Sequence, residues 1–304
     1  MRRPPSFFQT FYEWWIELSL KACGLLSIGI TVAIACVLVF GAEEFFRDPH
    51  VSIIEFLTGT EWTAPMQPAK YGIWPLLVGT LMVAGIAGII ALPLGLTTAI
   101  YLSEYAHPKV RDIAKPILEL LAGIPTVVYG FFAVYTITPM LDHLFPWLHI
   151  GRPYNQISGG IVVAIMILPI IASLSEDALR SVPRALRDAS YALGATQFET
   201  STQVVVPAAL SGVMASFILG LSRAIGETMA VTLACGGLTQ LSFDPRVGVA
   251  TMTAYIVRIA KGDLPWGSTE FNSLFAVGLT LFFMTLAMNF VAEWIRARYR
   301  LVYQ

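Results

Sequence analysis

The sequence predicts an all-α integral membrane protein with six transmembrane helices, because its composition, its charge-free windows and its Lys and Arg placement agree. Of the 304 residues, 56% are hydrophobic and only 13% are charged, whereas a soluble domain carries about 25% charge. The mean hydropathy is +0.69. A chain this apolar needs lipid around much of its surface, so we expect one membrane domain.

Six windows without Asp, Glu, Lys or Arg locate the expected spans in order along the chain. Each is at least as long as the roughly 20 residues that a helix needs to cross the hydrocarbon. The second window exceeds one span, so we expect its start, at residues 71–76, to lie at an interface. We expect the fifth span to run as one helix from about Ala208 to about Cys235. The windows are residues 22–42, 71–103, 120–141, 153–175, 200–222 and 271–292.

The positions of Lys and Arg predict the orientation, because cytoplasmic loops carry an excess of these residues. With the N-terminus inside, 12 of the 19 fall on the cytoplasmic side, 6 fall outside, and Arg223 lies in the membrane. We therefore expect both termini in the cytoplasm.

The expected organisation is an N-terminal interfacial segment, a membrane domain and a cytoplasmic tail, at residues 1–20, 21–292 and 293–304. In the last outer loop, residues 252–260 predict a short amphipathic helix.

Metal, disulfide and nucleic-acid chemistry are not indicated. Cys23, Cys36 and Cys235 lie in apolar stretches at spacings that suit neither a zinc site nor a disulfide framework. The four histidines are scattered at or near loops, and the net charge of −1 gives no reason to expect nucleic acid. The spans contain no evident nucleophile–base pair, so we do not expect an enzyme.

Arg223 and Glu227 interrupt the apolar sequence of the expected fifth span. A continuous helix would place them on one face, one turn apart. Charged groups in hydrocarbon are costly and commonly mark the path of a polar substrate. Arginine also offers a fork of donors that suits oxyanions. We therefore expect the pair to contact a polar substrate, the alternative being that the two groups only neutralise each other between helices.

The loop between the fourth and fifth spans, residues 175–206, is the second candidate element. Pro183 suits the first turn of a helix and Gly194 suits a C-terminal cap with positive φ, after which a second helix can start at Thr196. The pattern predicts a helix, a sharp turn and a second short helix, although a plain amphipathic connector stays an alternative. We expect three alanines to pack and three charged residues to stay hydrated: Ala185, Ala189 and Ala192, against Arg184, Arg187 and Asp188.

The order of residues in this loop resembles the coupling-loop motif of ATP-binding cassette (ABC) importer permeases. That motif is Glu-Ala-Ala, three residues, Gly, nine residues, Ile, one residue and Leu-Pro. The resemblance implies the type I ABC importer permease architecture, with a short cytoplasmic coupling helix in a groove of a separate ATPase. Here the motif positions hold Asp188-Ala189-Ser190, Gly194, Val204, Val206 and Pro207. We expect coupling to the ATPase through Arg187, Asp188, Ala189, Gly194 and Pro207.

The energy source is expected on another polypeptide. No Walker A pattern, Gly, four residues and Gly-Lys-Ser/Thr, occurs in the chain. ATP and Mg are therefore expected on the partner ATPase, with no cofactor in this chain. The resemblance further implies the inner membrane of a bacterium.

Three stretches resemble the PstC-type permeases of phosphate-specific transport (Pst) importers. They are the core Arg223-Ala-Ile-Gly-Glu-Thr-Met-Ala-Val, the run Leu120-Leu-Ala-Gly-Ile-Pro-Thr-Val-Val-Tyr-Gly and the run Thr251-Met-Thr-Ala-Tyr. The resemblance covers spans two to six. It implies a PstA-like second permease subunit, an ATPase homodimer, a periplasmic or lipid-anchored phosphate-binding protein and inorganic phosphate as substrate. Another oxyanion such as sulfate, molybdate or phosphonate stays an alternative, as does an ion-coupled transporter or channel.

This resemblance suggests a role for each candidate residue of the path. Arg223 is expected to attract the oxyanion, while Glu227 accepts a hydrogen bond from a protonated phosphate, which sulfate at neutral pH cannot donate. Thr228 could add a hydroxyl. Gly123 and Pro125 could break the third span and turn backbone amides toward an anion, or they could simply allow close helix packing with a proline kink.

Overall fold

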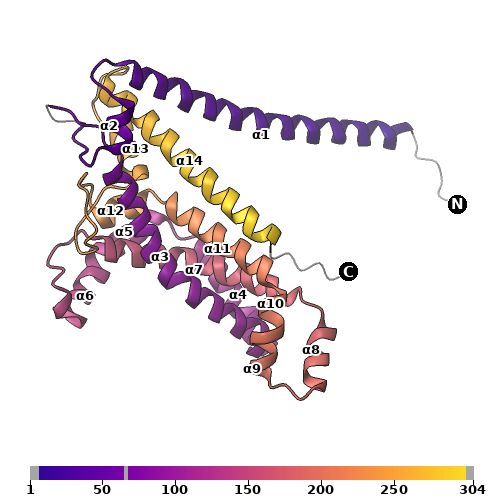
Figure 1. Cartoon of the computed structure of the whole chain (residues 1–304). Coiled ribbons are helices and arrows are strands. Elements are labelled where there is room, and N and C mark those ends of the chain that lie inside the picture. Colours follow the sequence, from indigo (N-terminus) through magenta and orange to yellow (C-terminus); the bar gives the residue numbers. More distant parts are fainter. Residues whose placement is uncertain (1–6, 65–67, 299–304) are drawn as a thin grey trace.

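The computed structural model describes residues 7–64 and 68–298 and shows a helical chain, as the sequence predicts (Figure 1). Within these ranges there is no β-strand, and an isolated antiparallel bridge joins Trp62 to Tyr71. The beginning of the predicted interfacial segment, residues 1–6, and the end of the predicted tail, residues 299–304, lie outside the described residues.

Four helices are long and apolar enough to cross a membrane, and two bent helix pairs raise the number of possible spans to six. The pairs are residues 108–122 with 126–144, bent by 87°, and residues 197–208 with 210–225, bent by 73°. If each bent pair is one span, the six predicted spans comprise four continuous helices and two broken ones. The long helices are α1 Phe7–Arg47, α3 Trp74–Ile100, α7 Gln156–Arg180 and α14 Thr269–Arg298.

The remaining elements are shorter. The α-helices are α2 Ile53–Thr58, α4 Pro108–Ala122, α5 Thr126–Phe132, α6 Thr138–Leu144, α8 Arg184–Ala192, α9 Gln197–Glu199, α10 Val206–Ala208, α11 Leu210–Ile225, α12 Met229–Cys235 and α13 Met252–Ala260. The π-helical turns are η1 Tyr101–Tyr105, η2 Ala133–Ile137 and η4 Thr200–Val205, and η3 Pro146–Leu148 is a 3₁₀ turn. The predicted helix at residues 252–260 is confirmed as α13, and α3 begins at Trp74, inside the long second window as expected.

Polar caps determine where several of these helices begin. The Asn155 side chain accepts a hydrogen bond of 2.8 Å from the backbone N–H of Ser158 at the start of α7. Thr251 accepts one from the N–H of Ala254 at the start of α13. Such caps satisfy amide groups that the first turn leaves without a partner, so α7 and α13 begin where the sequence supplies a side-chain acceptor.

The helices define two ends of the molecule (Figure 1). We name them the α8 end, where α8 and α9 lie, and the α13 end, where α2 and α13 lie. The first turn of α1 and the last turn of α14 lie toward the side of α8 (Figure 1). The described chain therefore starts and finishes on the same side of the bundle, as an even number of spans requires.

Small residues let the central helices approach closely. Ile171 of α7 is completely buried. A Cβ atom at Gly95 of α3 or at Gly220 of α11 would lie only 2.6 Å from this side chain. In a lipid environment helices associate through such close packing rather than through a hydrophobic driving force, so α3, α7 and α11 form the core that carries the site.

Helix α1 differs from the other long helices because it leaves the bundle (Figure 1). Its last turns pack on α14, where a Cβ at Gly41 would overlap the ring of Phe275. Most of its remaining side chains from Tyr12 onward are exposed and apolar. This helix therefore has an apolar surface that the chain itself does not cover.

Candidate functional site

The fifth span is broken between the two charged residues. Helix α11 ends at Ile225, Gly226 caps it, and α12 begins at Met229. The predicted single helix from Ala208 to Cys235 is therefore wrong, and so is the expectation that Arg223 and Glu227 share one helical face.

The break is stable because other groups replace the missing helical hydrogen bonds. The Glu227 N–H donates to the Ala224 carbonyl at 3.3 Å, which closes a tighter turn than an α-helix. Thr253 of α13 donates its hydroxyl proton to the Glu227 carbonyl at 2.8 Å. The Glu227 carboxylate in turn accepts from the Ala230 N–H at 3.0 Å, within the first turn of α12. Gly226 together with these partners makes the interruption a built feature of the fold.

The two charges of the site have opposite surroundings. Glu227 is buried, with 9% of its surface exposed, whereas Arg223 is exposed on the last turn of α11. Within the described part of the chain, Arg223 forms no ion pair, so the alternative reading, in which the two groups only neutralise each other, does not describe this structure. A free guanidinium thus lies on the surface of an apolar bundle, beside a carboxylate that is engaged by its own helix.

The broken third span lies next to the broken fifth span. The Tyr129 hydroxyl of α5 donates to the Leu121 carbonyl of α4 at 3.0 Å and so bridges the break between these two helices. Helices α5 and α12 touch directly, since a Cβ at Gly130 would lie 2.7 Å from the Cβ of Leu233. The two interruptions are therefore neighbours in space.

Gly123 and Pro125 form the predicted break in the third span, because α4 ends at Ala122 and α5 begins at Thr126. The N–H groups of Gly123 and Ile124 are already hydrogen-bonded, however. Gly123 N–H donates to the Leu120 carbonyl at 3.0 Å, and Ile124 N–H donates to the Leu121 carbonyl at 3.3 Å. A Cβ at Gly123 would meet only the Leu120 carbonyl of its own helix, at 3.3 Å. Among described atoms, close interhelical packing therefore does not explain this glycine.

Thr228 is half-buried at the break, one residue before α12. Its hydroxyl donates to the Gly226 carbonyl at 3.2 Å. In this geometry the hydroxyl oxygen can accept a hydrogen bond, but its proton is not available to an anion.

The loop at the α8 end adopts the predicted helix–turn–helix. Helix α8 ends at Ala192, Gly194 has a φ of +86°, and α9 begins at Gln197 behind a Thr196 capping box. Positive φ is accessible to glycine at little cost, so Gly194 allows the sharp turn. Pro207 lies in α10, next to the 73° bend that leads into α11.

The packed face of α8 is not the predicted one. The alanines at 185, 189 and 192 are exposed, whereas Leu186 packs on the core and the Ser190 hydroxyl meets the Thr200 hydroxyl at 2.9 Å. Asp188 and Ala189 stay exposed, as does Gly194. The turn itself presents two large apolar side chains to the surroundings, with Leu193 exposed by 90% and Phe198 by 67%.

Arg187 is turned inward, which corrects the expectation that it stays hydrated. Its guanidinium donates to both carboxylate oxygens of Glu104, at 2.9 and 3.0 Å, and to the carbonyls of Leu179 and Val182. The hydrogen bonds to Glu104 hold the pKa of Arg187 above its usual range. Arg187 therefore fastens α8 to the ends of α3 and α7 and does not present its charge to a partner.

A second buried charge cluster lies near this end and was missed by sequence reasoning. Glu176 of α7 is 1% exposed, and Lys115 of α4 donates to it at 2.9 Å. Lys115 also pairs with Asp177, and Arg111 and Arg180 approach Glu176 at 3.7 and 3.6 Å. Glu104 and Glu176 each directly follow a charge-free window. This position was the only feature of the sequence that could have pointed to them. Among residues 7–64 and 68–298, no group of His, Cys, Asp and Glu side chains is arranged to hold a metal ion.

Broken spans, a loop helix fastened by an ion pair and an unpaired arginine on an apolar bundle are typical of one class of protein, the multi-pass membrane permeases. Solved ABC importers share the fold. The alginate ABC transporter bound to its periplasmic protein matches with a TM-score of 0.65 at 15% identity, over 96% of this chain and 97% of that one. The MetNI methionine ABC transporter matches with a TM-score of 0.58 at 18% identity, over 75% and 98%. The predicted type I importer permease architecture is confirmed.

The chain belongs to the family described as "Binding-protein-dependent transport system inner membrane component", which it matches over residues 91–301. It is 36% identical to the "Probable ABC transporter permease protein YqgH" of Bacillus subtilis over 93% of this chain and 90% of that protein. It is 35% identical to the "Phosphate transport system permease protein PstC" of Haemophilus influenzae, over 90% and 91%. The PstC protein of Xylella fastidiosa is 32% identical, over 92% and 89%. The chain is thus the membrane subunit of an ABC importer, a family that works with ATPase and substrate-binding partners and is not itself an enzyme.

Proposed function

We propose that this chain is the PstC-type subunit of an ATP-driven importer of inorganic phosphate. The observation that carries the proposal is the exposed, unpaired Arg223 at the break of the fifth span. An unpaired charge in an apolar bundle is costly unless it faces water, a partner or a substrate. The printed names of the PstC relatives supply the substrate class.

Arg223 is the first contact for the oxyanion in this proposal. Its guanidinium can donate two parallel hydrogen bonds to phosphate oxygens. Glu227 then distinguishes the anion, because a phosphate that carries a proton can donate it to the carboxylate. In the present geometry one carboxylate oxygen accepts from Ala230 N–H, and the second oxygen can accept from phosphate, because a carboxylate accepts several hydrogen bonds. Thr228 can contribute only an acceptor unless its hydroxyl leaves the Gly226 carbonyl.

A PstA-like second permease subunit completes the path. Arg223 and the apolar length of α1 are both exposed surfaces of this chain. A second membrane subunit would cover α1 and close the path around Arg223. Phosphate then moves through a seam between two chains, and weak contacts let it leave again.

The α8 end couples the path to ATP. The loop at residues 175–206 offers exposed Asp188, Ala189 and Gly194, together with the apolar tips Leu193 and Phe198, to a groove of the ATPase homodimer. ATP and Mg bind on that partner. Because Arg187 fastens α8 to α3 and α7, a push on the loop is passed to these two helices, which pack against α11, and Pro207 marks where the motion enters α11.

The Lys and Arg distribution supports placing the α8 end and both termini in the cytoplasm of a bacterium, with the chain in the inner membrane. The α13 end then faces outward. A periplasmic or lipid-anchored phosphate-binding protein would deliver phosphate there.

The test is uptake of radiolabelled phosphate by cells that lack their own phosphate importers and express the complete system. Uptake should depend on ATP and be inhibited by unlabelled phosphate but not by sulfate, molybdate or phosphonate. Equal competition by one of these anions would assign the same architecture to another oxyanion. Transport by the purified chain without any ATPase would contradict an ABC importer and indicate an ion-coupled transporter or channel.

A further inference from the structure

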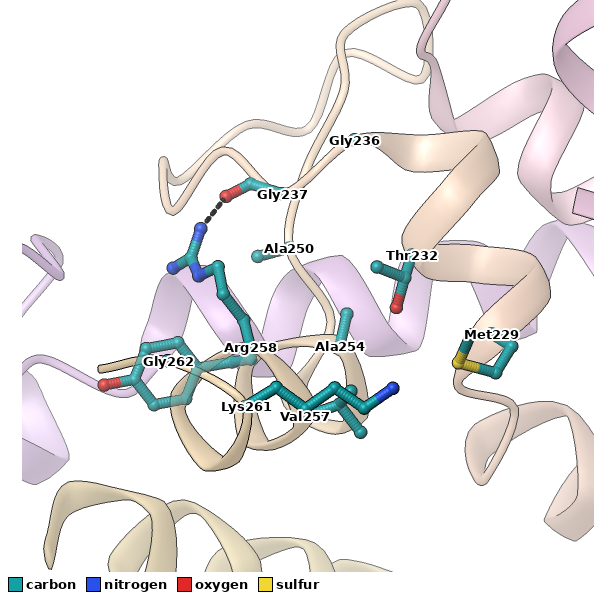
Figure 2. Close-up of a pocket in the computed structure, with 11 residues that line it drawn as sticks. Met229, Thr232, Gly236, Gly237, Ala250, Ala254, Val257, Arg258, Lys261 and Gly262 are labelled. Atoms are coloured by element: carbon teal, nitrogen blue, oxygen red, sulfur yellow. Dashed lines mark hydrogen bonds between the residues drawn. The ribbon is translucent and has the colours of Figure 1, made fainter. Parts of the chain in front are cut away.

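A pocket of about 350 Å³ lies beside α12 at the α13 end (Figure 2). Its walls come from α12, α13, the segment that joins them and the residues that directly follow α13. Arg258 and Lys261 are its charged lining residues, and none of the described residues that line it carries a carboxylate. The pocket is therefore electropositive although the chain as a whole has a net charge of −1.

The two cations of the pocket differ from three other cations at the same end, while Arg152, which also lacks an ion pair in the described chain, lies outside the lining. Arg47, Lys70 and Arg246 each pair with a carboxylate, at 2.7, 2.7 and 2.8 Å. Arg258 and Lys261 form no ion pair with any residue in the described ranges. Their charges are thus left for a ligand, whereas the other three are already balanced.

Arg258 is held in place without being neutralised. Its Nη1 donates to the Gly237 carbonyl at 2.6 Å (Figure 2). Its Cζ lies 5.5 Å from the centre of the Tyr255 ring, which supports the guanidinium by a cation–π contact. Both contacts fix the orientation of the fork and leave further N–H groups for an acceptor. Lys261 is exposed and points across the pocket toward Met229 (Figure 2).

The pocket continues to the break that carries Glu227. Met229, the first residue of α12, lines it. Ala254 lines it too, and the adjacent Thr253 donates its hydroxyl proton to the Glu227 carbonyl at 2.8 Å. A ligand in the pocket therefore lies one short step from the α11–α12 break. The nearby carboxylates of Asp263 and Glu270 stand outside the lining.

We propose that Arg258 and Lys261 form an oxyanion-binding site at the outer end of α12, where phosphate is held before it reaches Arg223. The identity of the anion and the outward direction rest on the proposed function. Clefts lined by one sign of charge raise the local concentration of a counter-ion and its rate of capture. The site draws phosphate from the binding protein into the bundle, and Arg223 takes it onward.

The test measures the potential of the pocket directly, without relying on transport. Val257 lines the pocket, is half-buried and carries no charge. Val257→Cys is placed in a background in which the exposed Cys23 and Cys36 are replaced by Ser, while the buried Cys235 is kept. Spheroplasts that express the full chain with its partners are treated with an anionic or a cationic methanethiosulfonate reagent.

With both cations present, the anionic reagent should react faster than the cationic one, and inorganic phosphate at millimolar concentration should slow both reactions. In the double variant Arg258→Gln/Lys261→Gln, the ratio of the two rates should fall by about 10-fold, and the protection by phosphate should disappear. Arg246→Gln is the matched control, because it removes a positive charge at the same end that is already paired with Asp244. Its ratio and its protection should stay unchanged.

Protection by phosphate that survives the loss of both cations would overturn the proposal, and so would an absence of protection in the parent protein. A double variant that keeps protection by phosphate, but whose labelling rate no longer changes in the presence of the binding protein, would show that this surface docks a protein instead. Failure of the proposed function is separable. If the complex takes up another oxyanion and that anion also protects Val257→Cys, the proposed binding site is supported. Only the identification of phosphate as the substrate is then contradicted.

Discussion

The α8 end and the α11–α12 break use charged residues in opposite ways. At the α8 end, Arg187 meets Glu104 and Lys115 meets Glu176, in each case through a short contact between a partly buried cation and a buried carboxylate. At the break, Arg223 has no charged partner in the described chain, and Glu227 accepts only a backbone N–H. Paired charges hold helices together, whereas an unpaired charge on an apolar bundle is available to bind a substrate. The comparison separates the parts that transmit force from the part that meets the substrate.

The largest effect is expected at the Arg187–Glu104 pair. These side chains are 15% and 6% exposed, so Arg187→Ala leaves a buried carboxylate without its partner. Removal of one partner from a buried pair costs about 3 kcal/mol in the free energy of unfolding. Thermal unfolding of the purified complex measures this loss, and ATP-driven uptake should fall with it. Arg184→Ala, which removes an exposed arginine of the same helix, is the control.

A double variant tests whether the lone buried charge of Glu104 causes the loss of stability in Arg187→Ala. Glu104→Gln combined with Arg187→Gln removes both charges and should recover part of the stability that Arg187→Ala loses, because no lone charge stays buried. If Arg187→Ala is as stable as Arg184→Ala, the pair does not fasten α8, and the contrast between the two regions disappears.

Lys115→Met should have the next largest effect. Glu176 keeps Arg111 and Arg180 at 3.7 and 3.6 Å, so its charge is not fully abandoned. We expect a loss of about 2 kcal/mol, as for a buried charged group that loses a direct hydrogen bond. Lys109→Met, on the exposed face of the same α4 helix, should change the unfolding temperature little. Equal unfolding temperatures for both variants would show that Lys115 adds nothing to the packing of α4 on α7.

The contrast also explains which features the sequence could predict. Spans, the α13 helix and the Gly194 turn follow from local patterns, namely charge-free windows, amphipathic spacing and a glycine where φ must be positive. The break at Gly226–Thr228 does not, because residues 219–231 are, apart from Arg223 and Glu227, apolar enough for a continuous membrane helix. It is stabilised by Thr253, 26 residues away in sequence. Likewise the inward turn of Arg187 depends on Glu104, 83 residues away. Long-range partners decided both features, and a single sequence does not reveal them.

Arg223→Lys tests the unpaired side of the comparison. Lysine keeps the charge but loses the planar fork that binds two phosphate oxygens at once. We expect phosphate uptake to fall about 10-fold, equivalent to one lost hydrogen bond to a charged group. The unfolding temperature should not change, because Arg223 is exposed and has no described ion-pair partner. A drop in stability comparable to that of Arg187→Ala would instead make Arg223 a structural residue.

Substitutions of Glu227 separate its role as a helix cap from a role in discriminating between anions. Its carboxylate accepts from Ala230 N–H at 3.0 Å, a contact that Gln can keep through its amide oxygen and Ala cannot. We therefore expect Glu227→Ala to lose about 1 kcal/mol, as for a lost helix cap, and Glu227→Gln to lose almost nothing. Both variants should reduce phosphate uptake, because neither carries the charge that accepts a proton-bearing phosphate. If Glu227→Gln leaves phosphate uptake intact and sulfate still excluded, then Glu227 only caps α12, and discrimination between anions belongs to Arg223 and the partner subunit.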